Sequence, residues 1–329
     1  MRDSIPCWQK ILAQGFSTAA ELLDFLQLPA AMGNTRAEKQ FRTRVPRGFA
    51  ALMQPGNRYD PLLLQVLAVD DELVINDEFV IDPLQELAVN PLKGLIHKYH
   101  GRVLLTLTGA CAVNCRYCFR RHFPYQDNNP GRQGWQPVLD YIAKDTSIRE
   151  VILSGGDPLL AKDAVLAELF DQLAAIPHLR ILRVHTRIPV VLPERITPGL
   201  LALLAAIPLQ TVVVLHSNHP QELDSRVAQA CTDLRAAGCV LLNQSVLLNQ
   251  VNDSAPVLAA LSERLFACGV LPYYLHLLDK VQGAQHFDVG LDKALAIFAQ
   301  LQRLLPGYLV PRLAREEGGK KNKTLIAMG

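Results

Sequence analysis

The strongest constraint on the fold of this chain is a repeated alternation of short apolar, β-branched runs with helix-like segments. The runs span residues 102–108, 151–154, 181–186, 211–216, 240–246 and 272–278. After a longer first interval their starts fall roughly 30 residues apart, the size of one strand–helix–strand unit. Strands that are apolar on both faces and alternate with helices predict a parallel sheet. Six such units predict an α/β fold, a partial (β/α)6 barrel of TIM-like type, better than a complete eight-unit barrel.

Polar side chains follow every one of these candidate strands. In chain order they are Cys111; Gly155, Gly156 and Asp157; His185 and Arg187; His216 and Asn218; Asn243 and Gln244; His276 and Asp279. Barrel enzymes build their sites at the carboxyl ends of the strands. The pattern therefore predicts an enzyme whose site lies at that end of the barrel.

The segments on either side of the barrel have a different pattern. Residues 1–96 are expected to form a mostly helical extension, because Thr18 and Glu21 form a capping box and Asn34 or Thr35 can cap a second helix. The barrel is placed at residues 97–288, and a C-terminal helix with a tail at 289–329. The sequence indicates no chemistry for the N-terminal extension.

Composition narrows the class of protein. The chain has 329 residues, half of them apolar, and a net charge of +2, which gives no reason to expect nucleic-acid or membrane binding. Seven cysteines do not form a secreted disulfide framework, and the start of the chain lacks an apolar signal core. A reducing, cytoplasmic location is expected. The oligomeric state is left open, a homo-oligomer included.

Three of the cysteines form the triplet Cys111-x3-Cys115-x2-Cys118. Three thiolates can hold three corners of an iron–sulfur cube and leave the fourth iron open for a substrate or cofactor. A structural zinc site needs four protein ligands, and His122 lies close enough in sequence to keep that alternative open. A second alternative is three incidental buried cysteines.

The triplet with Tyr117, followed by the Ser-Gly-Gly-Asp sequence ending at Asp157, resembles the radical S-adenosylmethionine (SAM) superfamily. Longer strings resemble the lysine 2,3-aminomutases within it, at residues 115–123, 189–197, 216–220, 243–248 and 272–274. Residues 275–283 and 309–316 and the compact C-terminus are most similar to the short form, which makes (R)-β-lysine for modification of translation elongation factor P. The resemblance covers nearly the whole chain and implies the radical SAM type of partial barrel.

For the first two cofactors, the resemblance implies a [4Fe-4S] cluster on Cys111, Cys115 and Cys118, with SAM on the fourth iron. Gly155, Gly156 and Asp157 match the positions that bind the methionine part of SAM, and His216 matches a SAM-contacting position. Independently of the family, paired glycines let backbone amides approach a ligand, and a carboxylate such as that of Asp157 can accept from an ammonium group.

The resemblance also implies pyridoxal 5′-phosphate (PLP), held covalently by a lysine. Lys323 precedes Thr324 and lies twelve positions after Pro311, as in the family motif. Lys320, directly after two glycines, is the alternative. The positions that match PLP contacts are Lys98, Tyr99, Arg102 and Gln244; two cations and a phenol suit a phosphate dianion.

For the substrate, Arg120 matches the residue that binds the lysine carboxylate, and Asp279 one of two acids that hold its ε-ammonium. The second acid is Glu316 here, where the stand-alone aminomutases have aspartate. An ordinary ion pair is the alternative for Arg120 and Asp279. The resemblance implies conversion of L-lysine to (R)-β-lysine, an electron donor such as flavodoxin or ferredoxin, and a link to elongation factor P and its lysyl ligase. A metabolic aminomutase and a redox or iron–sulfur protein without turnover are the other hypotheses.

Overall fold

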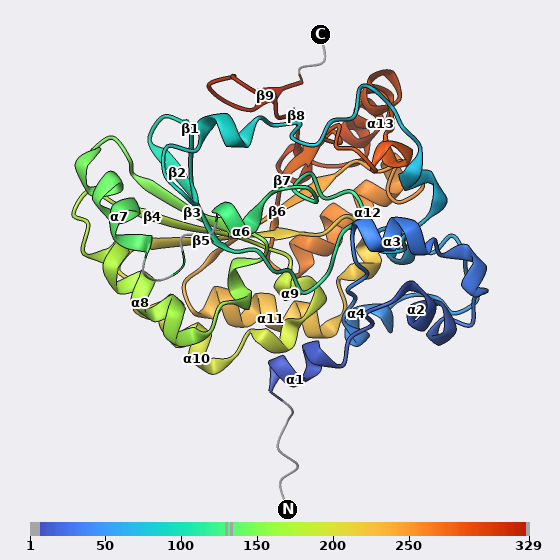
Figure 1. Ribbon diagram of the computed structural model, residues 1–329, viewed down its shortest axis with the longest axis horizontal. Helices are drawn as coiled ribbons and strands as arrows, with labels where there is room; N and C mark the ends of the chain where they lie inside the picture. Colours follow the sequence, from blue (N-terminus) through green and yellow to red (C-terminus); the bar gives the residue numbers. More distant parts are fainter. Residues whose placement is uncertain (1–6, 129–130, 132–133, 327–329) are drawn as a thin grey trace, which may run out of the picture.

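The computed structural model describes residues 7–128, 131 and 134–326. They form one nine-stranded sheet whose strands follow in chain order, with helices packed along its outer side (Figure 1). The strands are β1 (Leu95–Tyr99), β2 (Arg102–Thr108), β3 (Glu150–Gly155), β4 (Ile181–Thr186), β5 (Gln210–His216), β6 (Val240–Val246), β7 (Leu271–His276), β8 (Arg312–Arg315) and β9 (Thr324–Leu325). Strands β2 to β8 pair in parallel, and β1 and β9 add antiparallel edges. All six predicted strands form, and the α/β class with a mostly parallel sheet is confirmed.

Six helices make the crossovers between consecutive parallel strands. They are α7 (Trp135–Lys144), α8 (Asp163–Ala174), α10 (Pro198–Ala206), α11 (Ser225–Ala236), α12 (Ala255–Ala267) and α13 (Leu291–Leu304). Each buries an apolar stripe, such as Leu166, Leu169 and Leu173 of α8, against the sheet and its neighbours. The short helices α6 (Tyr125–Asn128) and α9 (Ile188–Val191) follow β2 and β4 at the site end.

The strands are not apolar on both faces throughout, contrary to the expectation. In β4 and β6, buried residues alternate with partly exposed ones. The buried set faces the helices, whereas Arg183 and His185 of β4 and Gln244 of β6 line a cavity inside the curved sheet. A strand that lines a ligand cavity needs polar side chains on one face, so its periodicity is two.

Strands β1, β8 and β9 were not predicted. β8 has four residues and β9 two, too few for a periodic signal, and β1 carries His97 and Lys98. These strands nevertheless set the positions of several charged residues. β1 pairs with β2 in a register that places Tyr99 opposite Arg102, and β8 pairs with β9 so that Arg315 lies opposite Thr324.

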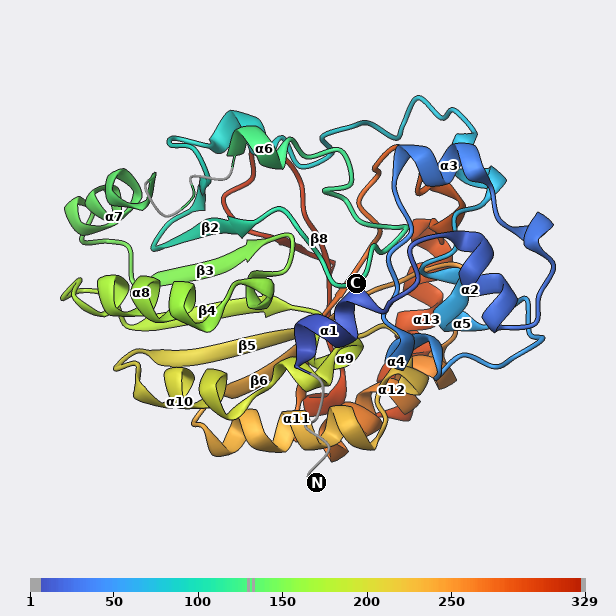
Figure 2. The same ribbon diagram turned by 60° about the horizontal axis from the view of Figure 1, so that its bottom comes forward.

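The N-terminal helices pack at one end of the barrel (Figure 2). They are α1 (Trp8–Ala13), α2 (Ala19–Phe25), α3 (Thr35–Gln40), α4 (Arg47–Ala50) and α5 (Pro61–Leu64). The predicted capping box of Thr18 and Glu21 opens α2, and Asn34 caps α3. Leu22, Phe49 and Leu62 belong to the same hydrophobic cluster as the strand residues, so extension and barrel share a core. In the part of the chain that the structure describes, no helix has the length and apolar character needed to cross a membrane.

Candidate active site

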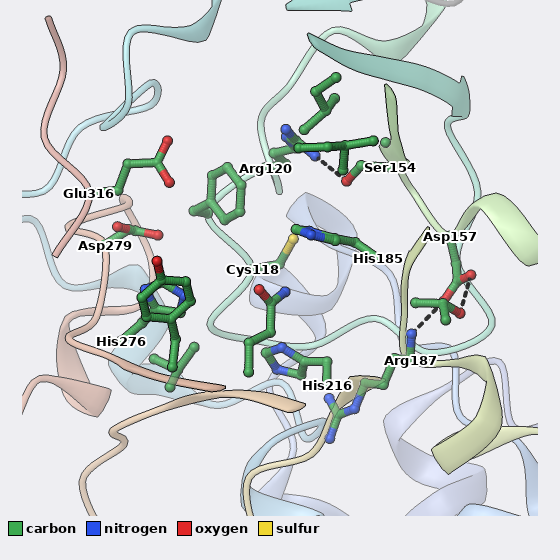
Figure 3. Close-up of a pocket in the computed structure, with 18 of the residues that line it drawn as sticks. Cys118, Arg120, Ser154, Asp157, His185, Arg187, His216, His276, Asp279 and Glu316 are labelled. Carbon is green, nitrogen blue, oxygen red and sulfur yellow. Dashed lines mark hydrogen bonds between the residues drawn. The ribbon is translucent and has the colours of Figure 1, made fainter. Parts of the chain in front are cut away.

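A cavity of about 460 Å³ opens at the carboxyl ends of the parallel strands, and every site residue predicted from the sequence lines it. They are Lys98, Tyr99, Arg102, Cys111, Cys115, Cys118, Arg120, Gly155, Gly156, Asp157, His216, Gln244, Asp279, Glu316 and Lys323. Figure 3 shows Asp279 and Glu316 on one side and Asp157 and Arg187 on the other, with Cys118, His185 and His216 between them. We call the region of the three cysteines, Asp157 and Arg187 the cysteine end, and that of Lys98, Tyr99, Asp279, Glu316 and Lys323 the lysine end.

The three cysteines lie on the loop between β2 and α6, and all are free thiols. Burial, together with the negative charge of the neighbouring cysteines, raises the pKa of Cys118 to about 11 and that of Cys111 well above its usual range. A buried thiol set of this kind needs a cation to hold it as thiolates, which suits iron–sulfur ligation. His122 instead bonds through Nε2 to the carbonyl of Gln282 and does not line the cavity.

The N-terminal extension supports this loop through a buried carboxylate. Glu72 accepts from Arg116 at 2.8 and 2.6 Å and from Arg121 at 2.7 Å. Arg116 lies between Cys115 and Cys118 and is fully buried, as is Glu72. The sequence indicated no chemistry for the extension; in the structure the extension holds the segment that carries the cysteines.

Gly155, Gly156 and Asp157 have a structural role that the sequence interpretation did not include. The amides of Gly156 and Asp157 donate to the carbonyls of Thr108 and Ala110, at 2.6 and 2.8 Å. A Cβ on Gly156 would lie 2.3 Å from the Ala110 carbonyl oxygen. The glycines therefore allow β3 to pack against the start of the cysteine loop, and those two amides are not available to a ligand.

The carboxylate of Asp157 is also fully engaged. It accepts from Thr186 Oγ1 at 2.7 Å and from the amides of Leu159, Arg187 and Ile188 at 2.7 to 3.2 Å. These four bonds fill the acceptor capacity of a carboxylate. Burial outweighs them and raises the pKa of Asp157 to about 6. In this conformation Asp157 joins the ends of β3 and β4 and does not present an acceptor to an ammonium group.

His216, at the end of β5, lies against the aromatic residue of the cysteine triplet. Its Nε2 is 2.9 Å from the Tyr117 hydroxyl, and the two rings stack. Burial and the nearby Arg187 keep the pKa of His216 well below its usual value, so the ring is neutral. Gln244 of β6, which pairs with His216 in the sheet register, also lines the cavity.

At the lysine end, two hairpins bring separate segments together. The β1–β2 hairpin carries Lys98, Tyr99 and Arg102, and the β8–β9 hairpin carries Glu316 and Lys323. The Tyr99 hydroxyl is buried without a hydrogen-bond partner, and Arg102 stacks over its ring at 4.8 Å. An unpartnered hydroxyl beside the Arg102 guanidinium fits a phosphate group, although the carboxylate of Glu316 also acts on this hydroxyl. Lys320 is exposed and does not line the cavity, whereas Lys323 does.

Glu316 is the centre of an ion-pair network. It pairs with Lys323 and, at 3.0 Å, with Lys98, which is also 3.6 Å from Glu86. Burial opposes ionisation, but the two lysines outweigh it and hold the pKa of Glu316 below its usual range. Glu316 is thus a counter-charge that the two amines share.

For Arg120 and Asp279 the sequence left an ordinary ion pair as the alternative. Of the two, only Arg120 forms an ion pair with a described residue. Arg120 forms a bidentate pair with Glu86 at 2.7 and 2.8 Å and donates to Ser154 at 3.0 Å, which uses three of its five N–H groups. Asp279 makes no side-chain hydrogen bond or ion pair with any described residue. Burial and the charge of Glu316 raise its pKa to about 7.

Sequence reasoning missed Glu86 as a site residue. It belongs to the N-terminal extension, on the short 3₁₀ helix Glu86–Val89, where one acid leaves no periodic signal. In the structure Glu86 is buried and is the counter-charge of Arg120 and Lys98. His185 and Arg187 were noted only as strand-end residues; both line the cavity, and His185 Nε2 is buried without a partner.

Comparison with known proteins supports the sequence resemblance. A family model described as the Radical SAM superfamily matches residues 105–256. The L-lysine 2,3-aminomutase of Escherichia coli (strain K12) is 51% identical over 320 residues, covering 96% of this chain and 93% of that protein. The Haemophilus influenzae enzyme of the same name is 52% identical, covering 97% and 95%. That of Clostridium subterminale is 35% identical over 97% of this chain and 77% of its own length.

Proposed function

This chain belongs to the lysine 2,3-aminomutase family of radical SAM enzymes, and we propose that it converts L-lysine to (R)-β-lysine. The observation that carries the proposal is one cavity with three free cysteines at one end and Lys323, among acids and cations, at the other. In the overall reaction the amino group moves from C2 to C3 and a hydrogen moves from C3 to C2. The reaction is an isomerisation, with no net oxidation.

The radical SAM family implies a [4Fe-4S] cluster and SAM. Cys111, Cys115 and Cys118 would ligate the cluster, which with SAM supplies a radical able to remove hydrogen from an unactivated carbon. PLP, the second cofactor we propose, would be bound by Lys323 and supplies the carbonyl that carries the migrating nitrogen. The Tyr99 hydroxyl and the Arg102 guanidinium are available to its phosphate.

The charges at the lysine end support lysine as the substrate. Asp279 presents a carboxylate without a protein partner to the cavity and can accept from the ε-ammonium, and Arg120 retains two N–H groups for the α-carboxylate. A second acid, Glu316, lies close by. An acidic substrate such as glutamate would place its side-chain carboxylate against these acids.

The test is anaerobic reconstitution with iron, sulfide and PLP, then incubation with SAM, dithionite and L-lysine. Mass spectrometry should detect (R)-β-lysine, with 5′-deoxyadenosine formed in the same mixture. Deoxyadenosine without a β-amino acid would leave SAM cleavage intact and contradict the aminomutase assignment. The same assay with L-glutamate should give no β-amino acid.

We further propose that the β-lysine serves the modification of elongation factor P. The support is the resemblance of residues 275–283 and 309–316 to the short form, and a match over 93% to 95% of the two relatives at 51% and 52% identity. All seven cysteines are free, which suits a cytoplasmic enzyme with flavodoxin or ferredoxin as electron donor. The reaction product, offered to the lysyl ligase of elongation factor P, should modify that factor better than L-lysine does; equal modification would contradict the link.

A further inference from the structure

Arg187 lies directly against the cysteine loop, and both ends of the residue are fixed. It is 6% exposed, and its Nη1 donates to Cys115 Sγ and to the Tyr117 hydroxyl, each at 2.8 Å. Its backbone amide donates to Asp157 at 2.7 Å, one of the bonds drawn in Figure 3. A permanently charged guanidinium therefore lies within hydrogen-bond distance of one of the three cysteine sulfurs.

Two buried residues hold the other side of this guanidinium. Nη2 donates to Gln65 Oε1 at 2.7 Å and to Glu222 Oε2 at 3.0 Å. Gln65 and Glu222 have no exposed surface and are joined to each other at 3.2 Å. Gln65 comes from the N-terminal extension, and its carbonyl oxygens also bind the Arg116 amide and the Tyr117 hydroxyl. The extension thus fixes both the loop and the arginine.

The electrostatic consequence follows from the charge of the group that the cysteines would hold. Reduction of an iron–sulfur cluster adds one negative charge, and hydrogen bonds to the ligand sulfurs together with nearby charge set its potential. A buried cation next to Cys115 favours the reduced state, and a buried anion opposes it. Salt and bulk water screen buried charges much less than surface charges, so the opposed charges of Arg187 and Glu222 both influence the cluster.

We infer that Arg187 is a positioning residue that raises the reduction potential of the cluster through its bond to Cys115, and that Glu222 moderates the effect while holding Arg187 in place. The inference rests on the proposed function only in needing a cluster on the three cysteines. Because Gln65 bonds to Arg187, the N-terminal extension would also influence the potential at which the cluster accepts an electron.

The experiment is a redox titration of the anaerobically reconstituted full-length protein, without SAM, followed by electron paramagnetic resonance of the reduced cluster. Arg187→Gln should lower the ratio of reduced to oxidised cluster at a fixed solution potential by about tenfold, equivalent to a shift of about 59 mV for a one-electron couple. Glu222→Gln should change the ratio in the opposite direction. General damage to the loop would not produce shifts of opposite sign.

The matched control is Arg195→Gln, because Arg195 is also fully buried in the barrel but bonds to the carbonyls of Leu159 and Ala161 and to Asp163. It should lower thermal stability and leave the potential unchanged. Arg187→Lys keeps the positive charge, so the reduction potential of the cluster in this variant should lie between those of wild type and Arg187→Gln.

The possible outcomes distinguish failure of this inference from failure of the proposed function. An unchanged potential in Arg187→Gln at full iron content, or shifts of the same sign in both variants, would overturn the inference and leave the proposed function standing. If Arg187→Gln does not retain iron, Glu222→Gln decides alone, and an unchanged potential there overturns the inference. A wild-type protein that assembles no cluster would overturn the proposed function as well.

Discussion

At the cysteine end of the cavity the polar groups that hold the loop bond mainly to one another, with only the Nε atoms of Arg121 and Arg187 buried without a partner among them. At the lysine end, in contrast, the Tyr99 hydroxyl and the Asp279 carboxylate have no hydrogen-bond partner among the described residues. Asp157 and Gln65 fill their acceptor positions with protein donors. The charges of the lysine end, in contrast, form ion pairs around Glu316, and a charged ligand has to replace some of these pairs with its own contacts. The comparison indicates that the cysteine end is preorganised by the fold, while the lysine end is completed by its ligands.

The largest effect expected at the lysine end is that of Lys323→Ala. It removes the only covalent attachment that we propose for PLP, so the visible absorbance of lysine-bound PLP and all β-lysine formation should be lost. Cleavage of SAM by dithionite-reduced protein should persist, because the cysteine end is untouched. The control is Lys320→Ala, which changes an exposed lysine of the same tail and should retain the absorbance. If only Lys320→Ala loses it, the assignment of Lys323 is wrong.

At the cysteine end the largest effect should come from Gly156→Ala. The new methyl group would lie 2.3 Å from the backbone oxygen of Ala110, just before Cys111, and backbone cannot yield as a flexible side chain does. We expect the loop to be displaced and most of the iron to be lost after reconstitution, measured as iron per chain. Gly307→Ala, where a Cβ meets open space, should keep its iron. Normal iron content in Gly156→Ala would show that the loop adapts and is not preorganised.

Glu72→Gln tests the preorganisation of the cysteine loop through the free energy of unfolding. The substitution leaves Arg116 and Arg121 buried with no full counter-charge, and breaking a buried pair in this way costs about 3 to 5 kcal/mol. Urea unfolding of the protein without iron or PLP should show this loss in the free energy of unfolding. Glu78→Gln, which removes an exposed pair with Lys280, should cause no measurable change. A small effect at Glu72 would mean that the extension does not stabilise the loop.

Sequence reasoning succeeded where the signal is local. The β-branched runs gave the six central strands, and the strand-end polar residues placed the cavity. The motif spacing predicts Lys323 over Lys320 for PLP, and of these two lysines only Lys323 lines the cavity. Interactions between distant segments had no such signal. Glu86 pairs with Arg120, 34 residues away, and Glu72 with Arg116, 44 residues away. The structural role of Asp157 had no local signal for the same reason, because the donors that fill its carboxylate come mainly from the end of β4.

The smallest of the expected effects is a pH dependence that belongs to the lysine end alone. Burial, with Glu316, raises the pKa of Asp279 to about 7. As the pH falls from 8 to 6 the carboxylate takes up a proton and loses its attraction for an ammonium group. We therefore expect the KM for L-lysine to rise roughly tenfold over this range, about 1.4 kcal/mol of binding.

Asp279→Asn removes the titrating carboxyl group and tests whether the two ends of the cavity act independently. The variant should have a high KM that hardly changes with pH, while its rate of SAM cleavage without lysine stays close to that of wild type. Asp288→Asn, which changes an exposed acid outside the cavity, should retain the wild-type profile. If Asp279→Asn kept the pH dependence, the titrating group would be elsewhere. If it slowed SAM cleavage as much as lysine turnover, Asp279 would support the whole cavity, and the two ends would not be independent.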